Sequence, residues 1–307
     1  MDVGVIGVGT MGKNHVRVYS ELKSVGHLGI CDVNTGAVQA IAQQHGATAY
    51  PTVEALLAHV DAVSICVPTP FHAQVAAQVF AAKKHVFIEK PICATAAEAK
   101  TLMAGAPKGI TIGVGHIERF NPIIAEIAKI VTKPLYVEMK RHNPASARVT
   151  GSSIIEDLMI HDIDIVLNVF FPKPCHIYSV GNADLCSVLM ECGGVPVALS
   201  ASRKASKKIR MIYIEEEDFT VEGDFMAQEV TIYRKPGQYQ FENERYVQEN
   251  IIEKVMVNKV EPLKVELSTF LDCARRHAPF PVTPEQAIRN LEVSEQIRAG
   301  FSAGIQA

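Results

Sequence analysis

The sequence predicts an α/β protein in which an N-terminal domain with a doubly wound parallel sheet precedes a C-terminal α/β domain with a large, open, mostly antiparallel or mixed sheet. Two observations predict this fold class. Short apolar runs alternate with Ala-rich helical patterns over residues 1–120, and strand-like runs without intervening helices follow between residues 176 and 233. The length of 307 residues suits two domains of roughly 150 residues each. We therefore divide the chain into domains of residues 1–120 and 121–307.

The first domain is expected to contain five parallel strands, because it has five short runs rich in apolar and β-branched residues. The first of them, Val3–Ile6, is continuously apolar, as a strand covered on both faces is. These runs are Val3–Ile6, Leu28–Cys31, Ala62–Val67, Val86–Ile88 and Ile110–Val114. Helical patterns accompany them at Met11–Lys23, Ala37–His45, Thr52–His59, Ala73–Ala82 and Ala96–Ala104. Strands that alternate with helices of this length predict right-handed β-α-β units.

The second domain begins with an amphipathic helix, Ile123–Val131, and a half-exposed strand, Leu135–Met139. A second helix runs from about Ile154 to Phe170 and is closed by Pro172. Six strand-like runs follow: His176–Val180, Ser187–Glu191, Val195–Ala201, Arg210–Glu215, Phe219–Glu222 and Glu229–Tyr233. Because no helices separate them, we expect an open sheet with mainly antiparallel neighbours.

The last part of the chain contains an irregular stretch and two helices. Residues 235–261 are polar and irregular, which favours a mobile loop or a flap that faces a partner. The closing helices are expected near Leu263–Arg276 and Pro284–Phe301. Thr283 is the expected N-cap of the final helix, with Pro284 at its first position. We expect this final helix to be able to pack back on the first domain.

The composition excludes several functional classes. Apolar residues make up 48% and charged residues 21%, and 30 Lys and Arg against 33 Asp and Glu give a net charge of -3. This balance offers no basic field for nucleic acid or an anionic membrane. No apolar run approaches the roughly 18 residues that span a bilayer, and Met1-Asp2 leads into a strand without the cationic start of a secretory signal. The seven scattered cysteines form no C-x-x-C pair, so we interpret them as reduced thiols of a cytoplasmic protein, with no zinc site or other metal site.

A glycine-rich turn follows the first predicted strand. Gly7, Gly9 and Gly12 have the spacing G-x-G-x-x-G between a strand and a helix. Gly7 permits the tight turn, Gly9 leaves room for a pyrophosphate, and Gly12 allows close packing of helix on strand. The N–H groups of Thr10 and Met11 at the helix start would then bind the pyrophosphate. The pattern predicts a Rossmann domain that binds a dinucleotide.

An acidic residue lies 20 residues after Gly12, as this motif requires. Asp32 ends the second strand, where its carboxylate can accept hydrogen bonds from the adenosine ribose hydroxyls. Its charge would repel a 2′-phosphate, and no Arg or Lys follows in Val33-Asn34-Thr35. NAD is therefore favoured over NADP. The alternative is that the glycines form only a turn and Asp32 only caps a helix.

The third strong strand ends in a proline-rich loop, Val67–His72. Pro68, Thr69 and His72 would border the cofactor crevice, because this crevice lies at the carboxyl ends of the strands. Two interpretations of His72 remain open. It either contacts the cofactor or forms only local hydrogen bonds at the start of a helix.

Two further features provide candidate catalytic groups. Glu89-Lys90-Pro91 ends the strand Val86–Ile88, so Glu89 and Lys90 also border the crevice, and Lys90 could stabilise a developing alkoxide. Asp157 and His161 are four residues apart on one helix, hence on one face. A carboxylate beside an imidazole raises its basicity and fixes its tautomer, as a general base near neutral pH requires. Taken alone, each residue also has an ordinary structural interpretation.

Together these motifs resemble the Gfo/Idh/MocA family of sugar and cyclitol dehydrogenases over nearly the whole chain. The matching stretches are Gly7–Gly12, Val67–His72, Glu89–Pro91 and Asp157–Asp164. The resemblance implies an NAD(P)-dependent oxidoreductase acting on CH–OH groups, with Lys90, Asp157 and His161 lining the reacting carbon. It also implies a nucleotide-binding domain followed by a domain that binds substrate and carries an oligomer interface on its open sheet.

A narrower resemblance points to the UDP-N-acetylglucosamine 3-dehydrogenase branch of this family. It depends on Gly115–Pro122 and Glu261–Glu266. His116, Arg119 and Asn121 would then contact cofactor or sugar, and their alternative is a capped helix start with a surface arginine. The sequence does not identify the residues that bind the nucleotide of such a substrate. A basic cluster, Lys140, Arg141, His142 and Arg148, could bind phosphate or form a solvated face.

Two other functions remain open, namely dehydrogenation of a free polyol or inositol and NAD binding without turnover by a regulatory protein. We expect a homodimer or homotetramer, because Val195–Leu199 and Met211–Ile214 carry more apolar residues than one covered sheet face requires. The expected partners are a small sugar or nucleotide-sugar, with no nucleic acid and no membrane.

Overall fold

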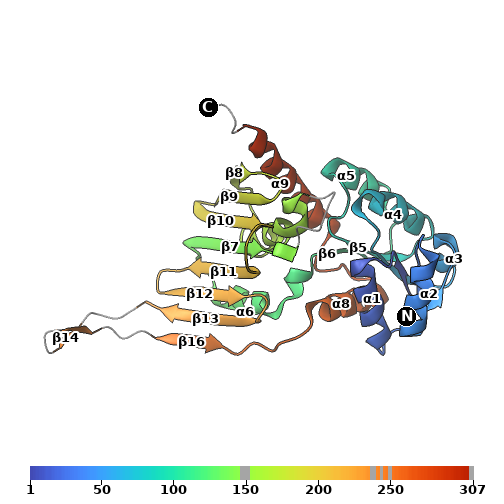
Figure 1. Ribbon diagram of the computed structural model, residues 1–307, viewed down its shortest axis with the longest axis horizontal. Coiled ribbons are helices and arrows are strands. Elements are labelled where there is room, and N and C mark those ends of the chain that lie inside the picture. Colours follow the sequence, from blue (N-terminus) through green and yellow to red (C-terminus); the bar gives the residue numbers. More distant parts are fainter. Residues whose placement is uncertain (146–152, 236–239, 243–244, 248–250, 304–307) are drawn as a thin grey trace. The chain divides into compact units, whose positions relative to one another are not determined.

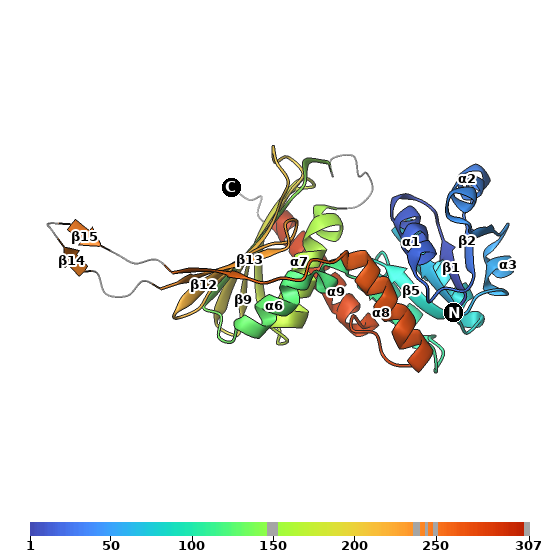
Figure 2. The same cartoon turned by 90° about the horizontal axis from the view of Figure 1, so that it is seen from below.

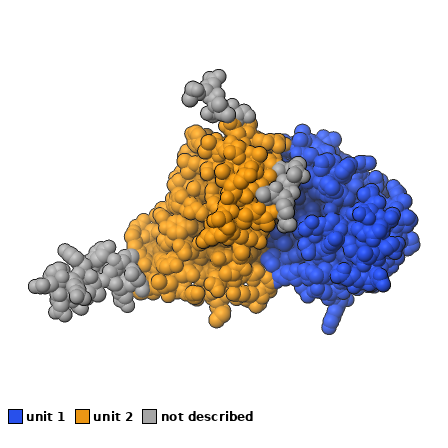
Figure 3. Space-filling view, viewed as in Figure 1, with its two compact units in different colours: residues 1–117, 261–292 blue, residues 118–260, 293–307 orange. Residues whose placement is uncertain are grey.

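A computed structural model describes residues 1–145, 153–235, 240–242, 245–247 and 251–303. The chain forms two compact units, coloured separately in Figure 3. Unit 1 contains residues 1–117 and 261–292, and unit 2 contains residues 118–260 and 293–307.

Unit 1 is built on a six-stranded, all-parallel sheet with the strand order β3-β2-β1-β4-β5-β6. Its strands are β1 (Val3–Ile6), β2 (Leu28–Cys31), β3 (Thr48–Ala49), β4 (Ala62–Ile65), β5 (His85–Glu89) and β6 (Ile112–Gly115). Every residue of β1, β2 and β4 is buried, which explains why these strands are almost entirely apolar. The exception, Ser64 in β4, shares a hydrogen bond with Tyr19 at 2.8 Å. The five predicted strands are confirmed, and the two-residue β3 is too short to give a sequence signal.

Helices accompany the strands of unit 1 (Figure 1). They are α1 (Thr10–Glu21), α2 (Thr35–His45), α3 (Val53–Leu57), α4 (His72–Ala81), α5 (Ala96–Ala104) and α8 (Pro262–Arg276). Three begin at side-chain caps, in which Asn34, Thr52 and Thr95 accept the N–H of the residue three positions later. A short 3₁₀ turn, η1 (Thr69–Phe71), precedes α4. The doubly wound sheet predicted from the sequence is confirmed.

Unit 2 contains an eight-stranded mixed sheet with the order β16-β13-β12-β11-β7-β10-β9-β8. The strands are β7 (Tyr136–His142), β8 (His176–Gly181), β9 (Leu185–Cys192), β10 (Val195–Ser202), β11 (Ile209–Glu215), β12 (Phe219–Asp224), β13 (Glu229–Arg234) and β16 (Ile252–Val255). Only the pair β7 and β10 is parallel among the described pairs. The predicted open, mostly antiparallel sheet is therefore confirmed.

Helices cover one face of this sheet, as Figure 2 shows. They are α6 (Pro122–Ile130), a continuous helical segment of residues 155–170, and the C-terminal part of α9 (Pro284–Ala303). The middle segment comprises π-helical turns at Ile155–Met159 and Val166–Phe170 around α7 (Ile160–Ile165). The core of unit 2 lies between these helices and the inner face of the sheet. A 3₁₀ turn, η2 (Ile117–Phe120), precedes α6.

The prediction of an irregular stretch over residues 235–261 is wrong for the part that the structure describes. β16 pairs with β13 at the edge of the sheet, and β14 (Gln240–Glu242) pairs with β15 (Arg245–Val247). Residues 236–239, 243–244 and 248–250 lie outside the described residues. Because Glu253 and Lys254 interrupt the apolar pattern of β16, the sequence did not reveal this strand, although charged residues are common at sheet edges.

The prediction that all seven cysteines are reduced is also wrong. Cys175 and Cys192 form a disulfide, with Sγ atoms 2.05 Å apart. In the antiparallel pair of β8 and β9, His176 lies opposite Glu191. Cys175, which precedes His176, therefore lies opposite Cys192, which follows Glu191. Sequence spacing alone does not show this register. Cys31, Cys66, Cys93, Cys186 and Cys273 are free thiols.

Candidate functional site

A cavity of about 730 Å³ lies at the carboxyl ends of the strands of unit 1. Its walls come from the residues after β1, β2, β4 and β5. The strand order reverses between β1 and β4, and in doubly wound sheets ligands bind in the crevice at this point. The predicted cofactor residues that line the cavity are Gly7, Gly9, Thr10, Met11, Asp32, Pro68, Thr69, His72, Glu89 and Lys90.

The glycine turn has the geometry that binds a pyrophosphate. Gly7 has φ +91°, and a Cβ there would lie 2.7 Å from the backbone of Cys66 and Val67. Gly12 does not line the cavity, because it packs beneath the turn, where a Cβ would lie 1.9 Å from the carbonyl oxygen of Gly7. A Cβ on Gly9 would meet no atom within 4 Å and would project into open space. Since α1 begins at Thr10, its first N–H groups are available to an anion.

Asp32 is attached to this turn by its own hydrogen bonds. Its Oδ2 accepts the N–H of Val8 at 2.6 Å, and its Oδ1 accepts the N–H of Asn34 at 2.9 Å. A carboxylate has about four acceptor positions, so acceptor capacity remains for ribose hydroxyls. Asn34, and not Asp32, caps α2 through its side chain. Among the described residues that line the cavity, Lys90 is the only lysine or arginine, so no cation accompanies Asp32.

His72 is buried between two loops of the cavity wall. Its Nδ1 lies 2.9 Å from the carbonyl oxygen of Pro91, and its Nε2 lies 2.9 Å from that of Val67. The ring therefore links the loop after β4 to the segment after β5. His72 also lines the cavity, so its contact with the cofactor stays a prediction beside these hydrogen bonds.

A buried pair supports the backbone of Lys90. His15 Nε2 on α1 lies 2.7 Å from Glu89 Oε1, and Glu89 Oε2 accepts the N–H of Lys90 at 3.2 Å. Burial raises the pKa of Glu89, but the hydrogen bond and charge of His15, with the charge of Lys90, outweigh it and lower this pKa. The half-buried Lys90 is thus anchored beside the cavity. Sequence reasoning missed His15, because no motif relates it to Glu89.

Other cavity residues were also missed, and most gave no signal. They are Ile6, Cys31, Val33, Val53, Cys66, Val67, Phe71, Gln74, Val75 and Gln78. Val33 is fully exposed directly after Asp32, and Phe71 is half-exposed. Exposed apolar side chains at a concave site favour ligand contact. The sequence pointed to these two residues only by position, because Val33 follows Asp32 and Phe71 lies in the predicted loop Val67–His72.

In unit 2, Asp157 and His161 lie on the helical segment 155–170. Both side chains are half-buried. Asp157 Oδ2 accepts a hydrogen bond from Nη2 of the buried Arg203 at 3.2 Å. Asp157 belongs to the π-helical turn and His161 to α7, and such turns are frequent at functional sites. Arg203 is a partner of Asp157 that sequence reasoning did not identify.

A network of buried charges adjoins these residues in unit 2. The guanidinium of Arg141 donates to Asp162 Oδ1 at 2.7 and 2.9 Å and to Glu118 Oε1 at 2.7 Å. Arg210 Nη1 donates to the same Glu118 oxygen at 3.1 Å. Burial raises the pKa of Glu118, yet the charges of Arg141 and Arg210 outweigh it and lower this pKa. Asp162 shows the opposite balance, since burial raises its pKa more than Arg141 lowers it.

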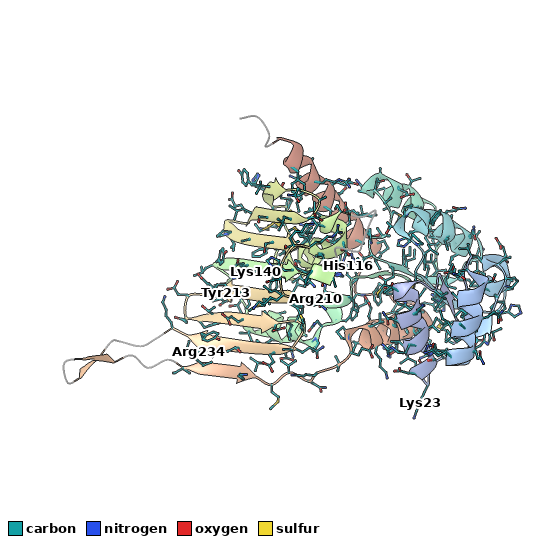
Figure 4. All side chains as sticks on the ribbon, in the orientation of Figure 1. Lys23, His116, Lys140, Arg210, Tyr213 and Arg234 are labelled. Carbon is teal, nitrogen blue, oxygen red and sulfur yellow. A yellow bond between two sulfur atoms is a disulfide. The ribbon has the colours of Figure 1, made fainter. Side chains whose placement is uncertain are left out.

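The basic cluster predicted near residue 140 is dispersed. Arg141 is buried in the network, Lys140 pairs with Glu138 at 3.0 Å, and His142 contacts Ser200 at 3.1 Å. Figure 4 labels Lys140 on β7. Arg148 lies outside the described residues.

The three residues of the narrower motif have defined contacts within their units. His116, which follows β6 in unit 1, is buried with its Nε2 3.4 Å from Asn290 Nδ2. Arg119 forms two hydrogen bonds with Asp164, at 2.9 and 2.8 Å. Asn121 caps α6 and donates to the carbonyl oxygen of Phe225 at 3.0 Å.

Comparisons with known proteins agree with this geometry. A family model described as an oxidoreductase family with an NAD-binding Rossmann fold matches residues 1–116. UDP-N-acetylglucosamine 3-dehydrogenase from Acidithiobacillus ferrooxidans is 31% identical, covering 100% of this chain and 99% of that protein. Its solved structure covers the same shares at 30% identity and a TM-score of 0.88.

Two more distant proteins are also similar. Myo-inositol 2-dehydrogenase from Thermotoga maritima is 25% identical over 69% of this chain and 67% of its own length. Levoglucosan dehydrogenase in complex with NADH and levoglucosan is 16% identical with a TM-score of 0.84, covering 99% of this chain and 97% of that one. This last similarity shows a shared fold.

Proposed function

Because the chain belongs to the Gfo/Idh/MocA oxidoreductase family, we propose that it oxidises a secondary hydroxyl of a nucleotide-sugar, UDP-N-acetylglucosamine at carbon 3. It is an NAD-dependent oxidoreductase that acts on CH–OH groups. The observation that carries the substrate proposal is the 31% identity over the full chain to an enzyme named for this reaction. The inositol dehydrogenase resembles only about two thirds of the chain.

The cofactor cavity fits a dinucleotide on its own geometry. The turn around Gly9 and the start of α1 would hold the pyrophosphate, and Asp32 would hold the adenosine ribose. When bound, NAD supplies the chemistry by accepting a hydride from the reacting carbon. The residues of this chain supply position, charge and a place for the proton.

We assign the proton transfer to three residues as part of the same proposal. His161 takes the proton of the substrate hydroxyl and acts as general base. Lys90 Nζ stabilises the alkoxide character of that oxygen, because a cation there opposes the developing negative charge. Asp157, held by Arg203, orients this arrangement. His116, Arg119 and Asn121 remain proposed contacts of substrate or cofactor, and His116 is the next candidate for the base.

The same residues disfavour a purely regulatory role. A protein that binds NAD without turnover would not need Lys90, Asp157 and His161 together, and all three are present. Dehydrogenation of a free polyol or inositol is the second candidate, supported by the similarity to the myo-inositol enzyme.

Assembly and location complete the proposal. We propose a homodimer or homotetramer formed through the outer face of the sheet in unit 2. Alternate residues of β9 are buried, so its other side chains point outward, and this face exposes large apolar groups: Tyr178, Val180, Leu185, Leu189, Met211 and Tyr233. Such an exposed apolar patch marks an interface. No described helix is long and apolar enough to cross a membrane, and we propose a cytoplasmic location with no nucleic acid partner.

The test compares substrates on the purified protein with NAD. UDP-N-acetylglucosamine, free N-acetylglucosamine and myo-inositol are each assayed for NADH formation, and the product is identified by mass spectrometry. We expect the highest kcat/KM with the UDP-sugar and a product lighter by two hydrogens. Turnover of myo-inositol alone would overturn the substrate assignment.

A further inference from the structure

The loop between β10 and β11 carries an unusual density of positive charge. Residues 203–210 read Arg-Lys-Ala-Ser-Lys-Lys-Ile-Arg, with five cations and no acid among eight residues. The whole chain has a net charge of -3, so this run departs strongly from the average. Charge runs of this kind on an otherwise acidic protein indicate an anionic partner when the charges are not neutralised locally.

Three of the five cations have partners in the fold. Arg203 donates to Asp157, Lys204 Nζ lies 2.8 Å from Asp184 Oδ2, and Arg210 shares Glu118 with Arg141. Lys207 and Lys208 differ, because no ion pair to a carboxylate is found for them within the described part of the chain. Both are exposed.

Lys207 and Lys208 add positive charge to a network in which Arg141 and Arg210 are matched by two carboxylates, Glu118 and Asp162. Arg210 and Arg141 converge on one Glu118 oxygen, and Arg210 Nε is buried without a hydrogen-bond partner among the described residues. The charge of Arg210 is the main cause that lowers the pKa of Lys208, which means that the two cations repel each other. Figure 4 shows Arg210 at one end of β11, with Tyr213 further along the strand.

The loop adjoins the helix that carries the candidate base. β7 and β10 are parallel and end together, with His142 opposite Ser202, so the loop starts at the end of the sheet where β7 finishes. From its first residue, Arg203 reaches Asp157, four residues before His161. An anionic group of a substrate that binds to this loop therefore lies near Asp157 and His161, the proposed reaction residues of the same unit.

We propose that Lys207, Lys208 and Arg210 bind the diphosphate of the nucleotide-sugar substrate. This inference rests on the proposed function and names the part of the chain that separates a nucleotide-sugar from a free sugar. Arginine offers a planar fork of donors to phosphate oxygens, and lysine binds them as a point charge. A neutral polyol would leave Lys207 and Lys208 without a counterion. A diphosphate supplies the negative charge and the acceptors that the loop lacks.

The test uses the double variant Lys207→Gln/Lys208→Gln in the full-length protein. Its matched control is Lys129→Gln/Lys133→Gln, which removes the same charge from exposed lysines that precede β7 at the opposite end of the sheet. We expect the KM for UDP-N-acetylglucosamine to rise at least tenfold in the test variant, with kcat and the KM for NAD within twofold of wild type. The control should match wild type in all three.

Direct binding separates this inference from the proposed activity. Calorimetry with UDP requires no turnover, and the dissociation constant for UDP should rise at least tenfold in the test variant only. Uridine, which lacks phosphate, should bind wild type and variant equally. A weakened UDP affinity supports the site whether or not the sugar is oxidised. No UDP binding by wild type, or equal UDP binding by wild type and the test variant, would overturn it.

Discussion

Replacing Asp32 with alanine should move the cofactor preference from NAD toward NADP. In the folded protein its carboxylate already accepts the N–H groups of Val8 and Asn34, which fixes it at the mouth of the cavity. Hydrogen bonds to a charged group contribute about 1.5–3 kcal/mol each. Losing one such bond to the ribose should therefore lower kcat/KM for NAD by roughly 10- to 150-fold, at 1.4 kcal/mol per tenfold.

The same substitution removes a repulsion that acts only on NADP. One negative charge about 4 Å from another costs between about 1 and 4 kcal/mol, depending on how much water separates them. NADP should consequently gain, although modestly, because no arginine among the described residues lines the cavity to bind its 2′-phosphate. The ratio of kcat/KM values for NAD and NADP should fall by at least about 50-fold.

The assay measures this ratio for wild type, Asp32→Ala and Asp32→Glu. Asp32→Glu keeps the charge and should still reject NADP, so it controls for simple disturbance of the loop. Thermal melting of each variant separates a damaged fold from a changed preference. Equal use of NAD and NADP by wild type, or an unchanged ratio in Asp32→Ala, would refute the reasoning.

Three further predictions concern catalysis, stability and assembly. His161→Asn and Lys90→Met should each lower kcat by roughly 10²–10⁴-fold with little change in the dissociation constant of NAD. The loss of kcat in the double variant should be far smaller than the product of the two single losses. A near wild-type kcat in His161→Asn would exclude His161 as the base. His15→Ala should destabilise unit 1 by about 3–5 kcal/mol in urea unfolding, because it leaves Glu89 buried without its partner. The pKa of Glu89 is lowered from 4.5 in the folded protein, so its ionised carboxylate stabilises the fold fully above pH 4.5 and loses this effect as the pH falls through the lowered pKa. The loss of stability caused by His15→Ala should therefore be smaller in acid. An equal loss at pH 7 and at pH 3.5 would contradict this. Light scattering should show an oligomer that Leu189→Asp weakens, and a wild-type monomer at micromolar concentration would refute the interface.

Most of the fold could be predicted because its signals are local. Strands such as Val3–Ile6 are covered on both faces and are continuously apolar, and α5 begins at a threonine cap. The cofactor motif is local as well, since Gly7, Gly12 and Asp32 act through one turn and the two strands beside it.

The features that escaped prediction depend on long-range pairing. His15 and Glu89 are 74 residues apart, and Arg203 and Asp157 are 46 apart, so only the folded topology shows that they touch. The disulfide depends likewise on the register of β8 with β9. Arg141 was grouped with Lys140 and His142 in one basic cluster because the predicted strand ended at Met139. The observed β7 continues to His142, which places Arg141 on the buried face.

The transfer of a labelled hydrogen tests the central claim most directly. UDP-N-acetylglucosamine carrying deuterium at carbon 3 is incubated with the protein and NAD. The NADH and the UDP-sugar product are then both analysed by mass spectrometry. The proposed reaction predicts that the deuterium appears in NADH while a keto group forms at carbon 3 of the sugar. NADH without deuterium, or no NADH from this substrate while myo-inositol is oxidised, would contradict the account.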